Sequence, residues 1–404
     1  MKKGWKTKTL GEVCSFLNRG ISPRYLERGG ICVLNQKCVR DHRVSYEPSR
    51  RHDAQAKKVG SDRLIQAGDV LVNSTGTGTL GRVAQLRENP PEPTTVDSHV
   101  TIVRSTPGKF YSEFFGYMLI VIEDAIKEAG EGCGGQTELA RSVLAEKFSV
   151  HYPESLPEQQ RIVGILDEAF EGIATAKANA EKNFHSARAL FESHLQSVFT
   201  GRGNGWVEKP LGDLASFRNG INYTKDSKGE RIKIVGVRNF QKHFSAPLDD
   251  LDTVTIDGKL SELDSLKKDD ILAVRSNGNI ELIGRCILVG EVTEKISHSG
   301  FTIRIRLSNG SVIPKYVCHF MKSAGSRKLL TEGGTGTNIK SLNQGMLSAL
   351  AIPFPPIAAQ KVLVEQLESL SEETHRLKSI YQQKLAALES LKKSLLHQAF
   401  SGAL

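Results

Sequence analysis

The feature that most constrains this chain is an internal repeat with a period of 201 residues. The segment WKTKTLGEVCSFLN at residues 5–18 matches WVEKPLGDLASFRN at residues 206–219, which begins 201 positions further on. The same spacing separates Asp69 from Asp270. Solenoid repeats are much shorter, at about 20 to 45 residues. The repeat therefore indicates a domain that has been duplicated within one chain.

The first part of each copy has the pattern of short strands joined by polar loops. Apolar residues alternate with polar ones and are interrupted by Gly, Asn, Asp and Pro, as in GDVLVNSTG at 68–76 and GFTIRIRL at 300–307. This period of two is typical of half-buried strands. One short helix is expected near residues 111–129, with its counterpart near 314–325.

The last part of each copy has the pattern of one long helix with a coiled-coil seam. From 357 to 400 the chain contains no proline, and apolar residues recur at steps of mostly three and four. The seam positions in the second copy are Leu363, Leu367, Leu370, Thr374, Leu377, Tyr381, Leu385, Leu388, Leu391 and Leu395. The first copy has a similar seam with smaller residues, at Leu166, Ala169, Ile173, Ala176, Ala180, Phe184, Ala187 and Leu190. Two matching helices in one chain favour pairing with each other.

These patterns predict an α+β fold. Two similar globular domains of mixed short strands and helices are separated by two long helices, which form an intramolecular antiparallel coiled coil. The predicted ranges are 1–157 and 204–356 for the domains, and 158–203 and 357–404 for the helices. The alternative is a coiled coil between two copies of the chain, in a homodimeric DNA-binding regulator or scaffold.

Composition points to a polyanionic partner and away from a membrane. The formal net charge is +9 and the pI is about 9.1, which suggests nucleic acid first. The longest apolar run, at 114–122, is far shorter than the roughly 20 residues of a membrane span. The basic start MKKGWKTKTL leads into no signal-peptide core, so a cytoplasmic location is expected. The six cysteines are scattered and show no metal-ligand spacing.

A glycine pattern at 76–81 raises the possibility of a dinucleotide site. It matches G-x-G-x-x-G and follows an apolar run. The pyrophosphate site also needs a helix that opens on the last glycine, and Pro90, Pro91 and Pro93 oppose one here. The counterpart of this loop in the second copy, at 273–285, keeps a Gly-Arg pair but lacks the G-x-G-x-x-G pattern. A hydride- or methyl-transfer enzyme remains an alternative that rests on this pattern alone.

The whole chain resembles the specificity subunits of type I restriction-modification systems. The resemblance rests on the paired W…LGEV and W…LGDL openings and on the glycine-rich segments at 132–139 and 333–342. It rests also on YPESLPEQQRIV at 152–163 and IPFPPIAAQKVL at 352–363, each leading into a long helix that ends in F-[TS]-G. The family favours Glu where Ala359 stands, and the first copy departs from the pattern at His151 and Ser155.

The resemblance implies a DNA-recognition subunit without catalytic residues of its own. Each domain would read one half of a bipartite, asymmetric site in double-stranded DNA, and the helices would set the spacer. Two methyltransferase (M) subunits, and in some complexes restriction/translocase (R) subunits, would supply adenine-N6 methylation and DNA cleavage. S-adenosylmethionine, ATP and Mg would bind to those partners, and no cofactor or metal to this chain. The sequence agrees in lacking a Walker A motif, and in carrying Glu92 where an adenine methyltransferase N-P-P-[FY] motif has an aromatic residue.

Three segments that recur in both copies carry the residue types that read base edges. The first lies at 34–43 and 235–243, with predicted contacts Lys37, Arg40, Arg43, Arg238 and Asn239. The second is the glycine loop and its counterpart at 273–285, with Asn73, Ser74, Thr75, Thr77, Arg82, Arg275, Ser276, Asn277, Asn279 and Arg285. The third is the glycine-rich run, with Gln136, Thr337, Asn338 and Lys340. Solvated loops, hairpin turns and a domain-closing turn are the alternatives. His99 and His298, near matching strands, fit a structural role better than a ligand role.

Overall fold

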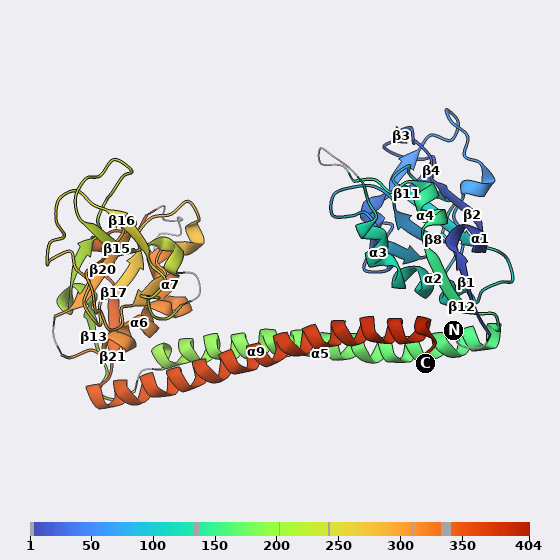
Figure 1. Ribbon diagram of the computed structural model, residues 1–404. Helices are drawn as coiled ribbons and strands as arrows, with labels where there is room; N and C mark the ends of the chain where they lie inside the picture. Colours follow the sequence, from blue (N-terminus) through green and yellow to red (C-terminus); the bar gives the residue numbers. More distant parts are fainter. Residues whose placement is uncertain (1–3, 132–136, 202, 241–242, 309, 333–340) are drawn as a thin grey trace. The chain divides into compact units, whose positions relative to one another are not determined.

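The computed structural model describes residues 4–131, 137–201, 203–240, 243–308, 310–332 and 341–404. The chain forms two compact units, one of residues 1–180 with 383–404 and the other of residues 181–382. Each unit contains one globular domain together with part of each long helix (Figure 1). We call the globular domain at residues 5–153 domain 1 and the one at residues 207–354 domain 2.

Domain 1 is built on an antiparallel four-stranded central sheet. Within the described residues its order is β2 (Cys14–Arg19), β11 (Val100–Ser105), β8 (Val70–Asn73), β9 (Val83–Gln85). A second sheet has the order β10 (Thr94–Val96), β4 (Ile31–Leu34), β7 (Arg50–His52), β3 (Tyr25–Leu26). Two smaller pairs are β1 (Trp5–Thr9) with β12 (Ser149–Pro153), and β5 (Val39–Arg40) with β6 (Arg43–Val44).

The helices of domain 1 are short. They are α1 (Leu10–Val13), α2 (Ser112–Val121), α3 (Glu123–Glu128) and α4 (Arg141–Glu146), with 3-10 turns η1 (Gln36–Cys38) and η2 (Ser61–Arg63). The single helix predicted near 111–129 is therefore two, because the backbone leaves the helical conformation at Ile122 (φ −92°, ψ 4°).

The central sheet of domain 1 is buried on both faces. Val70 and Val72 of β8 join Phe114 of α2 in the larger core. Leu71 and Ile102 point to the opposite face and join a smaller core that includes residues of β4. This alternation follows from the period of two in a strand.

Domain 2 repeats the topology of the central sheet. Its order is β14 (Ala215–Asn219), β20 (Thr302–Leu307), β17 (Ile271–Val274), β18 (Cys286–Leu288). The other strands are β16 (Asp252–Thr255), β15 (Arg231–Val235) and β19 (Ile296–His298) in one sheet, and β13 (Val207–Pro210) with β21 (Ala351–Phe354) in another. The helical segments are η3 (Leu211–Asp213), η4 (Val237–Phe240), η5 (Ile280–Leu282), α6 (Pro314–Lys322), α7 (Ala324–Glu332) and α8 (Gln344–Ser348).

The spacing between matched strands is not constant along the repeat. Strands β8 and β17 differ by 201 positions, but β11 and β20 are matched at 202. Val70 pairs with Val103 in domain 1, and Ile271 pairs with Ile305 in domain 2. The second copy therefore has one additional residue between these two strands.

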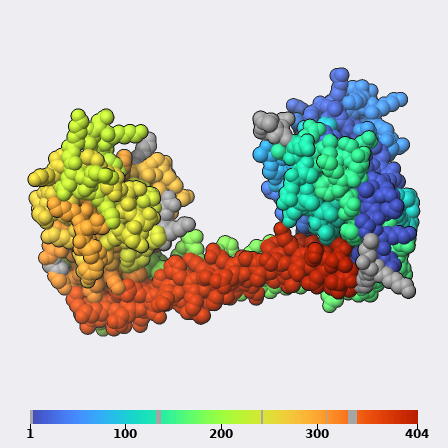
Figure 2. All heavy atoms as spheres, viewed as in Figure 1, coloured from blue at the N-terminus to red at the C-terminus, as the bar shows by residue number. Residues whose placement is uncertain are grey.

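Within each unit, a part of α5 (Leu156–Thr200) packs antiparallel against a part of α9 (Ile357–Ser401). In the first unit, Leu166 near the start of α5 shares a core with Leu396 and Phe400 near the end of α9. In the second unit, Phe199 at the end of α5 shares a core with Leu367 near the start of α9. In Figure 2 the red end of α9 lies directly against the first domain, in agreement with this shared core.

The predicted seam is wrong at two positions. Leu190 and Leu391 are 61% and 47% exposed, whereas Phe191 and Leu396, one and five positions further along the chain, pack in the domain cores. An α-helix turns every 3.6 residues and drifts away from a strict 3.5-residue repeat, so the buried stripe moves along the helix surface. Among the described helices, none is both long enough and apolar enough to cross a bilayer.

Candidate nucleic-acid interface

The segments predicted to contact DNA meet on one side of domain 1. The amide of Asn73 donates to the carbonyl of Gln36 at 3.0 Å. The backbone N–H of Ser74 donates to the carbonyl of His99, and the N–H of Leu139 donates to the carbonyl of Ser74, both at 2.8 Å. Residues from 34–43, 73–82 and 137–139 thus converge on the loop that follows β8.

Side chains join the same loops into one polar surface. The Gln36 Nε2 group donates to the Thr75 hydroxyl at 3.0 Å, and the Thr79 hydroxyl donates to Gln36 Oε1 at 2.7 Å. The Thr75 hydroxyl also lies 2.7 Å from Nδ1 of His99. Each of these polar groups is satisfied when Thr75 donates to Nδ1, which leaves Nε2–H of the exposed His99 ring as a donor.

Three residues were predicted to contact DNA through exposed side chains. This prediction is wrong, because their side chains are buried. Asn73, Ser74 and Asn239 are 0%, 1% and 4% exposed. The Asn239 Oδ1 atom accepts the N–H of Gly236 at 2.9 Å, and Ser74 bonds with the hydroxyl of Thr101. A short polar side chain satisfies a loop backbone as readily as a base edge, and these three hold the loops in place.

The exposed cations of domain 1 include a matched arginine pair. Arg40 and Arg43 face each other across the β5–β6 hairpin, both are exposed, and neither makes an ion pair with a described residue. Like charges directly opposite one another are unfavourable, so an anion would stabilise this hairpin. Lys37 and Thr77 are also exposed, whereas the Arg82 guanidinium is half-buried and donates to the carbonyl of Gly78 at 3.0 Å.

The tip of this hairpin contains a site that sequence analysis missed. Asp41 and His42 have φ angles of 51° and 59°, as in a two-residue type I′ turn. His42 Nε2 lies 2.9 Å from Glu123 Oε2 of α3. Burial raises the pKa of Glu123, but hydrogen bonds from His42 and Lys127 outweigh burial and hold it below its usual value. The sequence signal was a polar Asp-His pair between two short arginine-bearing strands.

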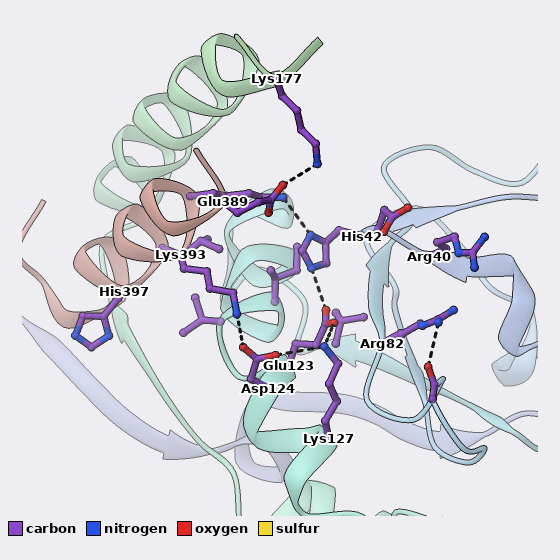
Figure 3. A pocket seen from close by; sticks show the side chains of 17 residues that line it. Arg40, His42, Arg82, Glu123, Asp124, Lys127, Lys177, Glu389, Lys393 and His397 are labelled. Atoms are coloured by element: carbon purple, nitrogen blue, oxygen red, sulfur yellow. Dashed lines mark hydrogen bonds and ion pairs between the residues drawn. The ribbon is translucent and has the colours of Figure 1, made fainter. Parts of the chain in front are cut away.

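A cavity of about 620 Å³ lies next to this turn within the first unit (Figure 3). It is lined by cations from the loops and from both long helices, including Arg40, Lys177 and Lys393. Three of its four carboxylates are engaged in ion pairs: Glu123 with Lys127 and Glu389 with Lys177, both at 2.7 Å, and Asp124 with Lys393 at 3.0 Å. The cavity is therefore a polar basin with an excess of positive charge.

The glycine loop does not have the geometry of a dinucleotide site. Gly76, Gly78 and Gly81 have φ angles of 104°, 78° and 82°, so the chain turns at each of them. After Gly81 the chain enters strand β9, and no helix opens there. The N-terminus of a helix, on which the pyrophosphate would sit, is missing from this loop.

Domain 2 brings the corresponding loops together in the same way. The N–H of Arg275 donates to the carbonyl of Phe301 at 2.8 Å, and the N–H of Leu342 donates to the carbonyl of Arg275 at 2.7 Å. The N–H of Ser299 donates to the carbonyl of Val235 at 3.0 Å. The predicted segments of the second copy therefore also converge.

Several predicted contacts of domain 2 have partners inside the domain. Arg238 forms an ion pair with Asp252 at 2.8 Å, and Asn279 Oδ1 accepts the N–H of Glu281 at 3.0 Å. Arg285 Nε donates to the carbonyl of Glu281 at 3.1 Å. The half-buried residues of this loop are Arg275, Ser276 and Asn277. Gln136, Thr337, Asn338 and Lys340 lie outside the described residues.

The two histidines near matching strands have different surroundings. His298 is 1% exposed and bonds with the Thr302 hydroxyl at 2.9 Å, and burial lowers its pKa to about 3. His99 is exposed at the turn before β11. Its carbonyl accepts the N–H of Ser74, as the carbonyl of Phe301 accepts that of Arg275. The structural counterpart of His99 is therefore Phe301, 202 positions further on.

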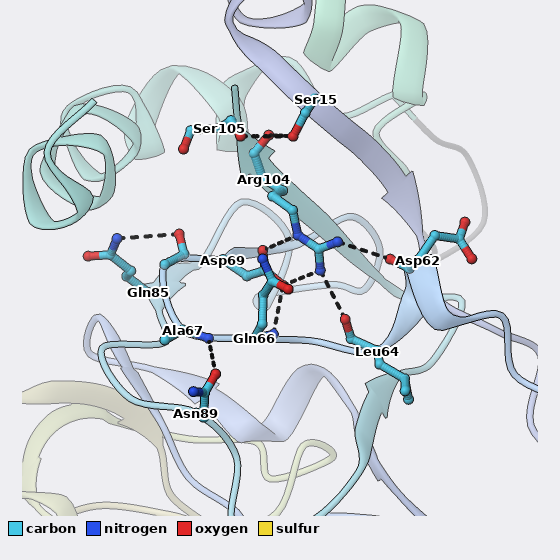
Figure 4. A network of polar contacts seen from close by, with 11 residues as sticks. Ser15, Asp62, Leu64, Gln66, Ala67, Asp69, Gln85, Asn89, Arg104 and Ser105 are labelled. Atoms are coloured by element: carbon cyan, nitrogen blue, oxygen red, sulfur yellow. Dashed lines mark hydrogen bonds and ion pairs between the residues drawn. The ribbon is translucent and has the colours of Figure 1, made fainter. Parts of the chain in front are cut away.

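In each domain, the same aspartate–arginine ion pair lies next to the strand that carries the converging loops. Arg104 donates from Nε and Nη2 to the carboxylate of Asp69, at 2.7 Å each, and Arg104 also reaches the carbonyl of Leu64 (Figure 4). Arg306 contacts Asp270 in domain 2 through the same atoms at the same distances. The aspartate precedes the strand that carries the converging loop, so the pair positions that strand.

A buried glutamine joins each domain to its long helix. Gln159 Oε1 accepts the N–H of Tyr111 at 2.8 Å, and its Nε2 donates to the carbonyl of Pro153 at 2.9 Å. Gln360 makes the matching bonds with Ile313 and Pro355, both at 2.9 Å. The Gln of each proline-containing motif thus ties the start of a domain helix to the end of the last strand.

Two copies of one α+β domain, each with converging polar loops and a long helix, define a protein with paired recognition domains. The family described as "Type I restriction modification DNA specificity domain" matches residues 2–182 and 203–388. The chain belongs to this family.

Two curated relatives are specificity subunits of type I restriction enzymes. The StySPI subunit of Salmonella potsdam is 26% identical over 265 residues, covering 62% of this chain and 56% of the relative. The EcoKI subunit of Escherichia coli K12 is 23% identical over 212 residues, covering 50% and 43%. The chain thus spans about half the length of the curated relatives it matches.

Solved structures confirm the fold. One similar chain comes from a solved structure described as the structural basis of complex assembly and conformational transition of the type I R-M system. It has a TM-score of 0.80 and 16% sequence identity to this chain, and the match covers 100% of this chain and 99% of that one. The HsdS subunit from Thermoanaerobacter tengcongensis has a TM-score of 0.61 and 16% identity, covering 100% and 98%. The family match and the curated relatives support the specificity-subunit interpretation and give no support to the homodimeric regulator.

Proposed function

We propose that this chain is the sequence-specific DNA-recognition subunit of a type I restriction-modification complex. Domain 1 reads one half of a bipartite, asymmetric site in double-stranded DNA, and domain 2 reads the other half. The paired helices α5 and α9 set the length of the unread spacer between the two halves.

The observation that carries this proposal is one framework bearing two different sets of loops. The ion pair of Asp69 with Arg104 recurs as Asp270 with Arg306 at the same distances. The loops supported by these pairs differ, with Gly-rich STGTGTLG after β8 and RSNGNIELIG after β17. A protein that reads two unlike half-sites needs this combination, because base contacts specify sequence while the scaffold only positions them.

The charge distribution supports a DNA partner. The net charge of +9 favours a polyanion, and the facing pair Arg40 and Arg43 makes no ion pair with the described residues. Phosphate contacts of this kind supply most of the sequence-independent affinity and make it depend on salt.

The chemistry is assigned to partner subunits. Two methyltransferase subunits carry out adenine-N6 methylation with S-adenosylmethionine, and a restriction/translocase subunit adds ATP- and Mg-dependent DNA cleavage where it is present. This chain binds no cofactor and no metal in the proposal. A cytoplasmic location follows from the DNA substrate.

The test is to co-express the chain with its methyltransferase partner and to map methylated adenines by long-read sequencing. The expected result is a two-part motif with a fixed unread gap, which disappears when this chain is omitted. Methylation that is absent, or that persists without the chain, would contradict the proposal.

A further inference from the structure

Phe301 is an exposed aromatic residue within the converging loops of domain 2. Its side chain is 61% exposed, although most phenylalanines of the described chain are buried or half-buried. It lies in the turn between β19 and β20, and its carbonyl accepts the N–H of Arg275 at 2.8 Å. The ring therefore belongs to the same loop cluster as the polar residues 275–277.

The backbone of this turn is held on several sides. Gly300 donates its N–H to the carbonyl of Ile221 at 2.8 Å, and the N–H of Phe301 donates to the Ser299 hydroxyl at 3.2 Å. A Cβ atom added at Gly300 would lie 2.0 Å from Oδ1 of Asn222, so the turn is closely packed against its neighbour. The phenyl ring thus projects from a supported backbone, and only its two side-chain torsions remain free.

Domain 1 carries a polar ring at the matched position. His99 is anchored to Thr75 through Nδ1 at 2.7 Å, and its carbonyl supports the loop after β8. His99 and Phe301 thus have the same backbone role, but one side chain is an imidazole and the other a phenyl ring. A residue that determines specificity is expected to differ in this way between two domains that read different half-sites. The framework residues Asp69 and Asp270, by contrast, are unchanged.

An exposed apolar ring in the same loop cluster as Arg275 and Asn277 suits one feature of the DNA major groove. Thymine alone presents a methyl group there, and Phe is among the residues that contact it. Arg275 and Asn277 are of the types that read guanine and adenine in the same groove. A minor-groove wedge would instead unstack and bend the duplex.

We propose that Phe301 is a specificity-determining residue that contacts the 5-methyl group of a thymine in the half-site read by domain 2. This inference rests on the proposed function, because it requires that domain 2 reads DNA. Burial of one methyl group is worth a factor of about four in affinity.

The experiment uses the full chain in complex with its methyltransferase partner, after the methylation motif has been mapped. Each thymine of the motif is replaced in turn by deoxyuridine, which lacks only the methyl group, and binding is measured by fluorescence anisotropy. We expect one replacement, in a single half-site, to weaken binding of the unmodified protein about fourfold. The Phe301→Ala variant should bind the duplex with thymine and the duplex with uracil at that position with equal affinity.

Two matched variants serve as controls. Leu263→Ala removes a side chain of similar exposure, 63%, that lies outside the three loop segments. His99→Ala changes the matched position of domain 1. Both should retain the full thymine preference in the half-site that responds to Phe301. Because the Phe301 ring is exposed, Phe301→Ala should melt at the temperature of the unmodified protein.

Distinct outcomes separate this inference from the proposed function. If no motif depends on this chain, the proposed function fails. If the motif is present but the penalty for uracil persists in Phe301→Ala, or no thymine shows a penalty, only the role of Phe301 is overturned. Equal loss of affinity for both duplexes, with reduced DNA bending, would show a wedge instead.

Discussion

Arg304 occupies in domain 2 the position that Ile102 occupies in domain 1. Ile102 pairs with Leu71 in the central sheet, and Arg304 pairs with Leu272, the residue 201 positions after Leu71. Arg304 is 5% exposed, its Nε has no hydrogen-bond partner among the described residues, and Nη1 donates to the carbonyl of Leu263 at 2.7 Å. Burial and the nearby Arg306 lower the pKa of Arg304.

Arg304→Ile should therefore stabilise domain 2, by about 1 kcal/mol, because it removes a poorly compensated buried charge. Differential scanning calorimetry would show the gain as a higher transition temperature. The converse change, Ile102→Arg, should destabilise domain 1, where Arg104 already bonds the carbonyl of Leu64. A lower transition temperature for Arg304→Ile would show that the bond to Leu263 outweighs the cost of burial.

Asp69→Ala should destabilise domain 1 by about 3 kcal/mol, because it leaves the largely buried guanidinium of Arg104 without its carboxylate. Asp270→Ala should have a similar effect on domain 2 through Arg306. Urea unfolding of each variant measures the loss. Asp53→Ala, at a half-exposed loop position, is the control and should change stability far less. Equal effects at Asp53 and Asp69 would contradict the structural role of the pair.

Gln159→Leu should loosen the junction between domain 1 and α5, because the N–H of Tyr111 and the carbonyl of Pro153 lose their partner. The cost of unpaired buried groups is about 1 to 3 kcal/mol each. Limited proteolysis should cut near residues 154–156 faster than in the unmodified protein. Gln160→Leu, on the exposed side of the helix, should leave the cleavage rate unchanged.

His298 should make domain 2 less stable in mild acid. Its pKa is lowered to about 3 in the folded state, against an ordinary value of 6.5, so only the unfolded state binds the proton in between. Stability is full above pH 6.5 and falls as the pH drops toward 3, with a loss of about 2 kcal/mol by pH 5. His298→Val, which copies Val96 of domain 1, should flatten this slope in calorimetric scans. His319, whose pKa burial lowers to about 4, accounts for a remaining slope.

A four-residue insertion near residue 181 of α5, with a matching one near residue 382 of α9, should lengthen the recognised spacer. Each insertion adds about 6 Å of helix and roughly one turn, so the apolar seam stays nearly in register. Methylation mapping would show both half-sites unchanged and the gap longer. An unchanged gap would refute the role of the helices as a ruler.

Much of the architecture could be predicted from the sequence, because it depends on local periodicity. The long helices follow from apolar spacing over many turns, and the domain duplication follows from the 201-residue repeat. The three loop segments were also found, because their glycines and polar residues interrupt strand patterns. Each of these signals is contained within a short stretch of chain or in the comparison of two such stretches.

The tertiary structure alone decided which polar side chains of these loops are exposed. Asn73 and Asn239 have the composition of base readers, yet both are buried against loop backbones. His99 and Phe301 are matched only after the strands are paired, because one additional residue shifts the repeat to 202 positions. Exposure and partnership depend on contacts between residues far apart in sequence. The sequence therefore determined the class of fold and the positions of the loops proposed to read DNA, and the packing of those loops determined which of their side chains are exposed.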